Sequence, residues 1–262
     1  MFEQAYGSRG KAPGGSESRQ VLNQTIHHAL VSHGHGVRAV REHGGRGAVC
    51  GLSDNCETMI PVTESPDDIA AAREAFGDSN LAILDPISRG AYSTKYLRRC
   101  GANRPKVERG DFSLIGLPTD FLGLNIYAGL FVRMDREGRP QVLHPSASYP
   151  RTDSPWLHLA PRALYWAPRL AAEVFKVRNV YVTENGCGYD DDVVKGVNAW
   201  TSTGLNIFAA TSRSSSGRSR TAHRFGAILC GVSSTTLSGP TAIPGGLESC
   251  TMISGPSAGR RS

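Results

Sequence analysis

Three polar side chains stand where apolar segments end, and their types could support nucleophilic or acid–base chemistry. Glu184 directly follows the apolar run 180–183, and Asn125 and Tyr127 close the apolar segment 120–127. Asn125 and Tyr127 are two residues apart, so on a strand they share a face. An acid at the end of a strand in a βα fold faces the usual active-site side. Spacing alone leaves another interpretation open, in which Glu184 is a turn acid and the other two are half-buried strand residues.

The elements that must position these side chains follow from hydrophobic periodicity and end signals. Ser65-Pro66 is typical of a helix start, and Gly44-Gly45 of a helix end. The pattern predicts three helices and three buried strands: helices over 21–43, 65–76 and 161–176, and strands over 48–52, 120–127 and 179–183. Their alternation favours parallel βα units. Three strands are too few to close a barrel, and each needs helices on one face to be buried.

Composition excludes several classes of protein. The chain has 262 residues, 39% of them hydrophobic, with no apolar run of about 18 residues, so no membrane partner is expected. The first 20 residues lack the apolar core of a secretory signal. Six cysteines without a C-x-x-C pair predict neither a disulfide framework nor a zinc ribbon. We therefore expect reduced thiols in a cytoplasmic protein.

The positive charge is concentrated at the carboxyl end. Residues 1–200 hold 23 Lys and Arg against 22 acids, whereas residues 201–262 hold six Arg and one acid, Glu248. The second segment is also rich in Ser, Thr and Gly, so we place a boundary near residue 200. This divides the chain into a globular body, 1–200, and a low-complexity, irregular tail, 201–262. Nucleic-acid binding through the Arg-rich tail is an alternative, but the balanced body argues against it.

Other candidate sites are weaker. The histidines of residues 27–35 scatter over more than one helix face and have no acid nearby, so a metal site is not expected. The glycines at 45, 47 and 51 miss the dinucleotide spacing by one position, and Cys187 has no His partner nearby. The acidic run 190–192 is most simply a solvated loop. No metal or cofactor is therefore predicted.

Five segments together resemble glycoside hydrolase family 1, the β-glucosidase family. Residues 183–186 (T-E-N-G) and 120–127 (D-F-L-G-L-N-I-Y) resemble two strand motifs of the family. Residues 27–34 resemble its H-H-x-x-x-x-H-G helix, 51–55 its G-I-x-x-N strand end, and 85–90 its D-P-x-x-x-G turn. The segments appear in family order and cover about residues 6–195.

The resemblance implies a partial (β/α)8 TIM barrel, roughly its second half with strands five to seven. It also implies a retaining hydrolase of terminal β-glycosides that works through a glycosyl-enzyme intermediate. Glu184 would be the nucleophile, Tyr127 the phenol that orients it, and Asn55 and Asn125 residues that line the sugar site. The partner would be a small-molecule β-glycoside, with no cofactor. The family's acid/base glutamate lies in an Asn-Glu-Pro motif, which this sequence does not contain.

These departures predict a chain that begins inside the barrel and is inactive as written. The family's eighth strand carries W-S-x-x-D-x-x-E-W, and no Trp follows Trp200. Codons of residues 230–246 read two bases later can spell that motif, so we expect a frameshift after about residue 198. A natural disordered Arg/Ser tail is the rival interpretation of the tail. A non-catalytic sugar-binding or interaction remnant is the alternative function, and the sequence does not indicate an oligomeric state.

Overall fold

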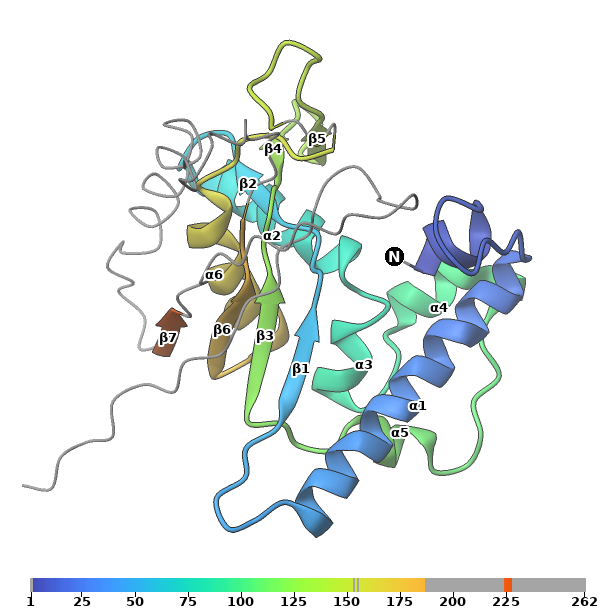
Figure 1. The fold of residues 1–262 in the computed structure, drawn as a ribbon. Coiled ribbons are helices and arrows are strands. Elements are labelled where there is room, and N and C mark those ends of the chain that lie inside the picture. The colour runs from blue at the N-terminus through green and yellow to red at the C-terminus, as the bar shows by residue number, and fades with distance from the viewer. Residues whose placement is uncertain (1, 153, 155, 187–223, 228–262) are drawn as a thin grey trace, which may run out of the picture.

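Parallel strands form the centre of the molecule (Figure 1). The computed structural model describes residues 2–152, 154, 156–186 and 224–227. Its main sheet has the order β1-β3-β6-β7, and every neighbouring pair is parallel. The strands are β1 (Gly51–Asp54), β3 (Phe121–Asn125), β6 (Asn179–Glu184) and β7 (Arg224–Ala227). The carboxyl ends of these strands therefore lie along one edge of the sheet.

One face of the main sheet is buried against two helices, α2 (Pro66–Ser79) and α6 (Ala163–Phe175), which lie behind it in Figure 1. Alternate strand residues such as Leu122, Leu124 and Val180 are buried there in the main hydrophobic core. The helices contribute Ala-rich faces, which let them approach the sheet closely, together with the fully buried rings of Phe76 and Trp166.

A second sheet, with the order β2-β4-β5, lies beyond the carboxyl end of the main sheet. Its strands are β2 (Met59–Pro61), β4 (Leu130–Met134) and β5 (Pro140–Leu143). β2 and β4 are parallel, whereas β4 and β5 form an antiparallel hairpin whose turn contains Gly138 at φ 72°. Helix α2 packs on this sheet as well, so it joins the two sheets.

The remaining helices flank the β1 side of the main sheet (Figure 1). They are η1 (Glu3–Gly7), α1 (Arg19–His43), α3 (Leu84–Arg89), α4 (Thr94–Cys100), η2 (Gly101–Asn103) and α5 (Asp111–Ile115). A smaller core, which includes Leu30, Tyr92 and Ile115, holds this group of helices together. Gly34 allows α1 and α5 to touch, because a Cβ there would meet the Leu114 carbonyl oxygen at 2.5 Å.

The structure confirms the three predicted helices and corrects several predictions for the strands. The strand expected over 48–52 is β1, which begins at Gly51, where pairing with Phe121 begins. The short strands β2, β4 and β5 were not predicted, and the expected turn at 85–90 is helix α3 ended by Gly90 in the left-handed conformation. Within the tail, residues 224–227 form the short strand β7 beside β6. The rest of the segment assigned to the frameshift lies outside the described residues.

The fold agrees with the expected α/β class, and its described part does not close into a barrel. The parallel main sheet with helices on one face is the arrangement that βα units predict. Within the described residues the sheet is open: no strand there pairs with the free edge of β1.

Candidate active site

The carboxyl edge of the main sheet brings two of the predicted residues into register. Glu184 is the last residue of β6, Asn125 is the last residue of β3, and the two are paired across the strands. Tyr127 lies two residues beyond the end of β3. The sequence predicted that Glu184 lies just after a strand. In the structure it is the last residue of β6, where it pairs with Asn125 of β3 and does not belong to a loop.

A β-bulge near the end of β6 changes the directions of its last side chains. Leu124 pairs with Val182 and the next residue, Asn125, pairs with Glu184, so Thr183 is the extra residue between them. Such a bulge breaks the strict alternation of side chains, and bulges are common beside active sites. As a result Thr183 and Glu184, although consecutive, both hydrogen-bond to side chains from the β3 segment. Sequence periodicity carried no signal for this bulge.

Tyr127 and Glu184 are joined directly. The Tyr127 hydroxyl donates to Oε2 of Glu184 at 2.5 Å. The backbone beyond the strands holds the pair in place, because the Ile126 N–H donates to the Glu184 carbonyl at 2.8 Å, and Nδ2 of Asn185 donates to the Ile126 carbonyl at 2.7 Å. Ile126 itself is buried in the core, on the opposite side from Tyr127. Glu184 is therefore held in place through both its side chain and its backbone.

Asn125 is held by hydroxyl groups from both neighbouring strands. Its Oδ1 accepts from Oγ1 of Thr183 at 2.6 Å and from Oγ of Ser53 at 3.1 Å. The two hydroxyl oxygens are themselves 2.8 Å apart. Ser53 and Thr183 were not singled out from the sequence; the family strand motifs placed them near the site, but nothing in their spacing predicted these contacts.

Asn55 is less firmly placed than the other three predicted residues. It follows the end of β1 and is exposed, and among the described residues its side chain has no hydrogen-bond partner. It shares the carboxyl edge of the sheet with Asn125 and Glu184. The preceding carboxylate belongs to Asp54, whose pKa is raised by burial, against an opposing hydrogen bond from the Asn55 backbone. A sugar-lining role for Asn55 stays a prediction.

An aromatic side chain that the sequence did not indicate lies beside the pair. The ring of Trp156 meets that of Tyr127 edge to face, with centroids 6.0 Å apart. Its side chain is 61% exposed, unusually high for Trp. It therefore contributes an apolar surface beside Tyr127 that remains open to solvent.

Among the histidines of α1, His27 has two polar partners in the group of helices beside the sheet. His27 is buried, with Nδ1 3.0 Å from the Tyr92 hydroxyl and Nε2 2.9 Å from Oδ2 of Asp111. The hydrogen bond with His27 holds the pKa of Asp111 below its usual range. Among the described residues no group of three His, Cys, Asp or Glu side chains could hold a metal ion. Cys187 and residues 190–192 lie outside those residues.

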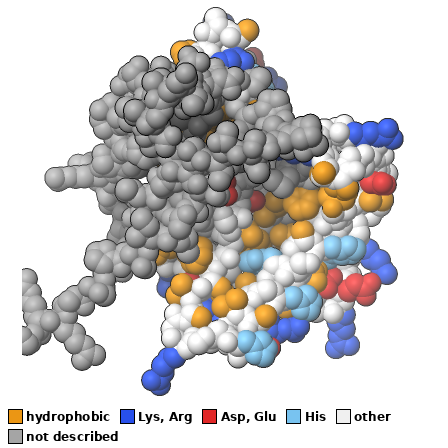
Figure 2. All heavy atoms as spheres, viewed as in Figure 1, with side chains coloured by type: hydrophobic (Ala, Val, Ile, Leu, Met, Phe, Trp, Pro, Cys, Tyr) orange, Lys and Arg blue, Asp and Glu red, His pale blue; other side chains and the backbone are white. Residues whose placement is uncertain are grey.

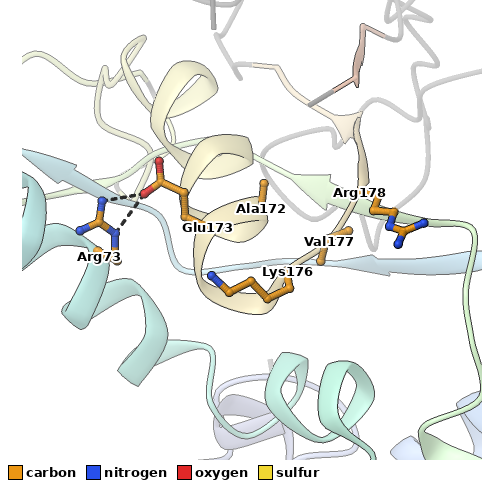
Figure 3. A pocket seen from close by; sticks show the side chains of 6 residues that line it. All are labelled: Arg73, Ala172, Glu173, Lys176, Val177 and Arg178. Atoms are coloured by element: carbon orange, nitrogen blue, oxygen red, sulfur yellow. Dashed lines mark hydrogen bonds and ion pairs between the residues drawn. The ribbon is translucent and has the colours of Figure 1, made fainter. Parts of the chain in front are cut away.

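A hollow in the described surface lies at the opposite end of the main sheet. It has a volume of about 450 Å³, and its lining includes Lys176 and Arg178, from the segment that leads into β6 (Figure 3). Arg73 in its wall is neutralised by Glu173, which it contacts at 2.7 Å and 3.0 Å. Because β6 runs away from this hollow towards Glu184, the hollow is separate from the candidate active site.

Comparison with known proteins places the chain in a family. The family model described as glycosyl hydrolase family 1 matches residues 1–201. The chain belongs to glycosyl hydrolase family 1. It is 31% identical over 183 residues to a 1,4-β-D-glucan glucohydrolase of Thermotoga neapolitana, a match that covers 70% of this chain and 43% of the relative. It is 32% identical over 186 residues to a β-glucosidase of an Agrobacterium species, covering 70% and 40%.

Two solved structures resemble the chain in fold. A family 1 β-glucosidase from Thermotoga maritima superposes with a TM-score of 0.65 at 26% identity, covering 81% of this chain and 48% of that one. Virulence factor SghA from Agrobacterium tumefaciens gives 0.66 at 28% identity, covering 81% and 47%. The chain thus spans less than half the length of the relatives it matches. None of its described helices is long and apolar enough to cross a membrane.

Proposed function

We propose that this family 1 chain carries the nucleophile half of a β-glucosidase active site. The observation that carries the proposal is the Tyr127–Glu184 hydrogen bond at the carboxyl edge of a parallel sheet. Active sites of βα barrels lie at that edge. The similarity to β-glucosidases of Thermotoga and Agrobacterium supports a terminal β-glucoside as the substrate.

The proposed chemistry is a double displacement. Oε1 or Oε2 of Glu184 attacks the anomeric carbon, a C–O bond to Glu184 forms, and the bond to the leaving oxygen breaks. Water then attacks the same anomeric carbon from the opposite face, and the C–O bond to Glu184 breaks to release the carboxylate. The two inversions leave the sugar with its original configuration. Tyr127 keeps the carboxylate oriented for the attack, and Asn125 and Asn55 bind sugar hydroxyls.

Protonation of the leaving group requires a second carboxyl group about 5 Å from the first. The sequence contains no Asn-Glu-Pro motif, so this chain on its own is proposed to be inactive towards ordinary glucosides. The same observation favours a second candidate function, a sugar-binding remnant without catalysis. The two differ in whether Glu184 can still form a covalent bond.

A substrate that needs no acid distinguishes them. A dinitrophenyl 2-deoxy-2-fluoro-β-D-glucoside carries a leaving group that departs unprotonated and leaves a slowly hydrolysed glucosyl ester. We expect mass spectrometry to find one fluoroglucosyl group on the peptide that contains Glu184. The variant Glu184→Gln keeps the size of the side chain and should not be labelled. Sugar binding without label on Glu184 would support the remnant instead.

A further inference from the structure

The bulge at Thr183 forms a hydroxyl–amide cluster in which the proposed reaction uses the Asn125 amide but neither of the two hydroxyl groups. Its three members, Ser53, Asn125 and Thr183, come from the three neighbouring strands β1, β3 and β6. All three contacts lie within hydrogen-bond distance: 2.6 Å for Thr183–Asn125, 2.8 Å for Ser53–Thr183 and 3.1 Å for Ser53–Asn125. The cluster adjoins Glu184 in the chain.

The structure places the Asn125 amide with its oxygen towards the two hydroxyl groups of the cluster. The amide oxygen faces the two hydroxyl groups, and a carbonyl oxygen has two lone pairs for them. The nitrogen Nδ2 must then point the other way. Among the described residues it has no hydrogen-bond partner, and it is not one of their buried unpaired atoms. Two N–H donors are thus left open at the edge that carries Glu184.

Packing holds the Thr183 side chain in the position that this cluster needs. A Cβ on Gly123 would lie 2.6 Å from Cγ2 of Thr183, so only a glycine leaves room for that methyl group. With the methyl group packed over Gly123, the hydroxyl of the branched side chain is directed at Asn125. Because β-branched side chains have few χ1 states, the hydroxyl is held with little rotational freedom.

We propose that Thr183, supported by Ser53, is a positioning residue that keeps the Asn125 amide turned so that its N–H groups donate to a sugar hydroxyl oxygen. This inference rests on the proposed function and names how the sugar is held beside the nucleophile. The bulge couples the two tasks, since one residue of the β6 end orients the sugar-binding amide and the next supplies the attacking carboxylate. The substitution Thr183→Val would keep the shape of the side chain and remove its hydroxyl group.

The test compares Thr183→Val with Thr183→Ser in the full chain. The side-chain amide of Asn125 is observed by NMR while methyl β-D-thioglucoside, which resists hydrolysis, is added. We expect the thioglucoside to shift the Asn125 amide signals in the unmodified chain and in Thr183→Ser. In Thr183→Val the free-state signals should already differ, and affinity should fall about tenfold. Thr25→Val, which removes a remote hydroxyl on α1, is the control and should match the unmodified chain.

Two results would overturn the inference. One is an Asn125 amide spectrum and thioglucoside affinity in Thr183→Val equal to those of the unmodified chain. The other is labelling of Glu184 by the fluoroglucoside while the Asn125 amide does not respond to thioglucoside, which leaves the proposed function intact. If Glu184 is not labelled, the proposed function fails, and the free-state amide spectra of the two Thr183 variants still decide whether Thr183 orients Asn125.

Discussion

At the scale of single residues, the proposed chemistry depends on one contact, in which the Tyr127 hydroxyl donates to Oε2 of Glu184 at 2.5 Å. Two-residue spacing put Asn125 and Tyr127 on one face, and the strand pattern put Glu184 at a strand end; the structure joins Tyr127 to Glu184. The Thr183 bulge could not be predicted, because it depends on how β6 pairs with β3 and not on the local sequence. The contact of Ser53 with Asn125 could not be predicted either, because the two residues lie 72 positions apart in the chain.

The Tyr127 hydroxyl offers the first prediction at this scale. Tyr127→Phe removes one hydrogen bond to Glu184 and leaves the ring against Trp156, so covalent labelling of Glu184 should slow by roughly tenfold without being abolished. Tyr181→Phe is the matched control, since Tyr181 lies on β6, the strand that ends in Glu184, and its ring packs on Phe121. Equal labelling rates in the two variants would show that the Tyr127 hydroxyl does not orient the nucleophile.

At the scale of elements, two glycines of α1 should respond in opposite directions. A Cβ at Gly34 would overlap the α5 backbone, so Gly34→Ala should separate α1 from α5 and destabilise the smaller core by about 1–3 kcal/mol. Nothing lies within 4 Å of a Cβ at the exposed Gly36, so Gly36→Ala should stabilise the helix by up to about 1 kcal/mol. Hydrogen exchange of α1 amides measures both changes; protection raised by Gly34→Ala would contradict the close contact.

Asp68 makes hydrogen bonds that the sequence signals of a helix start do not predict. The sequence predicts a first-turn acid, yet Asp68 is buried and accepts from the Thr63 hydroxyl, the Thr63 N–H and the Met134 N–H. These bonds, led by the Thr63 hydroxyl, hold its pKa below the usual range. A lowered pKa means that the stabilisation is complete above the unfolded-state value of about 4 and is lost as pH falls through the folded value.

We therefore expect Asp68→Ala to speed exchange of the Met134 amide at least tenfold at neutral pH, because that N–H loses its acceptor. The unmodified chain should approach the same rate, after correction for intrinsic exchange, only when the pH falls below about 4. Asp67→Ala, at the exposed neighbouring position, should change neither result. Unchanged Met134 protection in Asp68→Ala would refute the proposed link between α2 and β4.

At the scale of the whole molecule, the described part is an open sheet with helices on one face, and not a closed barrel. Composition and periodicity indicated the α/β class, but three-residue and four-residue strands such as β2 and β5 are too short to show a period. Apolar side chains remain exposed, Val49 at 69% and Trp156 at 61%, and Figure 2 shows others gathered with histidines on the viewed face. An unpaired strand edge and exposed apolar surface favour association.

The chain alone should therefore associate as its concentration rises, which sedimentation velocity would detect. Addition of the amino-terminal half of the Agrobacterium β-glucosidase, which supplies partner strands, should reduce that association. A sharp, reversible unfolding transition of a monomer, unaffected by the added half, would contradict this view of the open sheet.

The central claim is that Glu184 is the nucleophile. The measurement that tests it most directly uses the chain mixed with the amino-terminal half of the Agrobacterium β-glucosidase. With an acid/base carboxyl supplied by the added half, the mixture should hydrolyse an aryl β-glucoside, and Glu184→Ala should remove nearly all turnover, because no other group forms the covalent intermediate. Azide should then restore part of the activity by attacking from the face that Glu184 occupied, and NMR should identify the product as α-glucosyl azide. Hydrolysis that survives in Glu184→Ala without azide, or a β-glucosyl azide product, would contradict the assignment of Glu184 as the nucleophile.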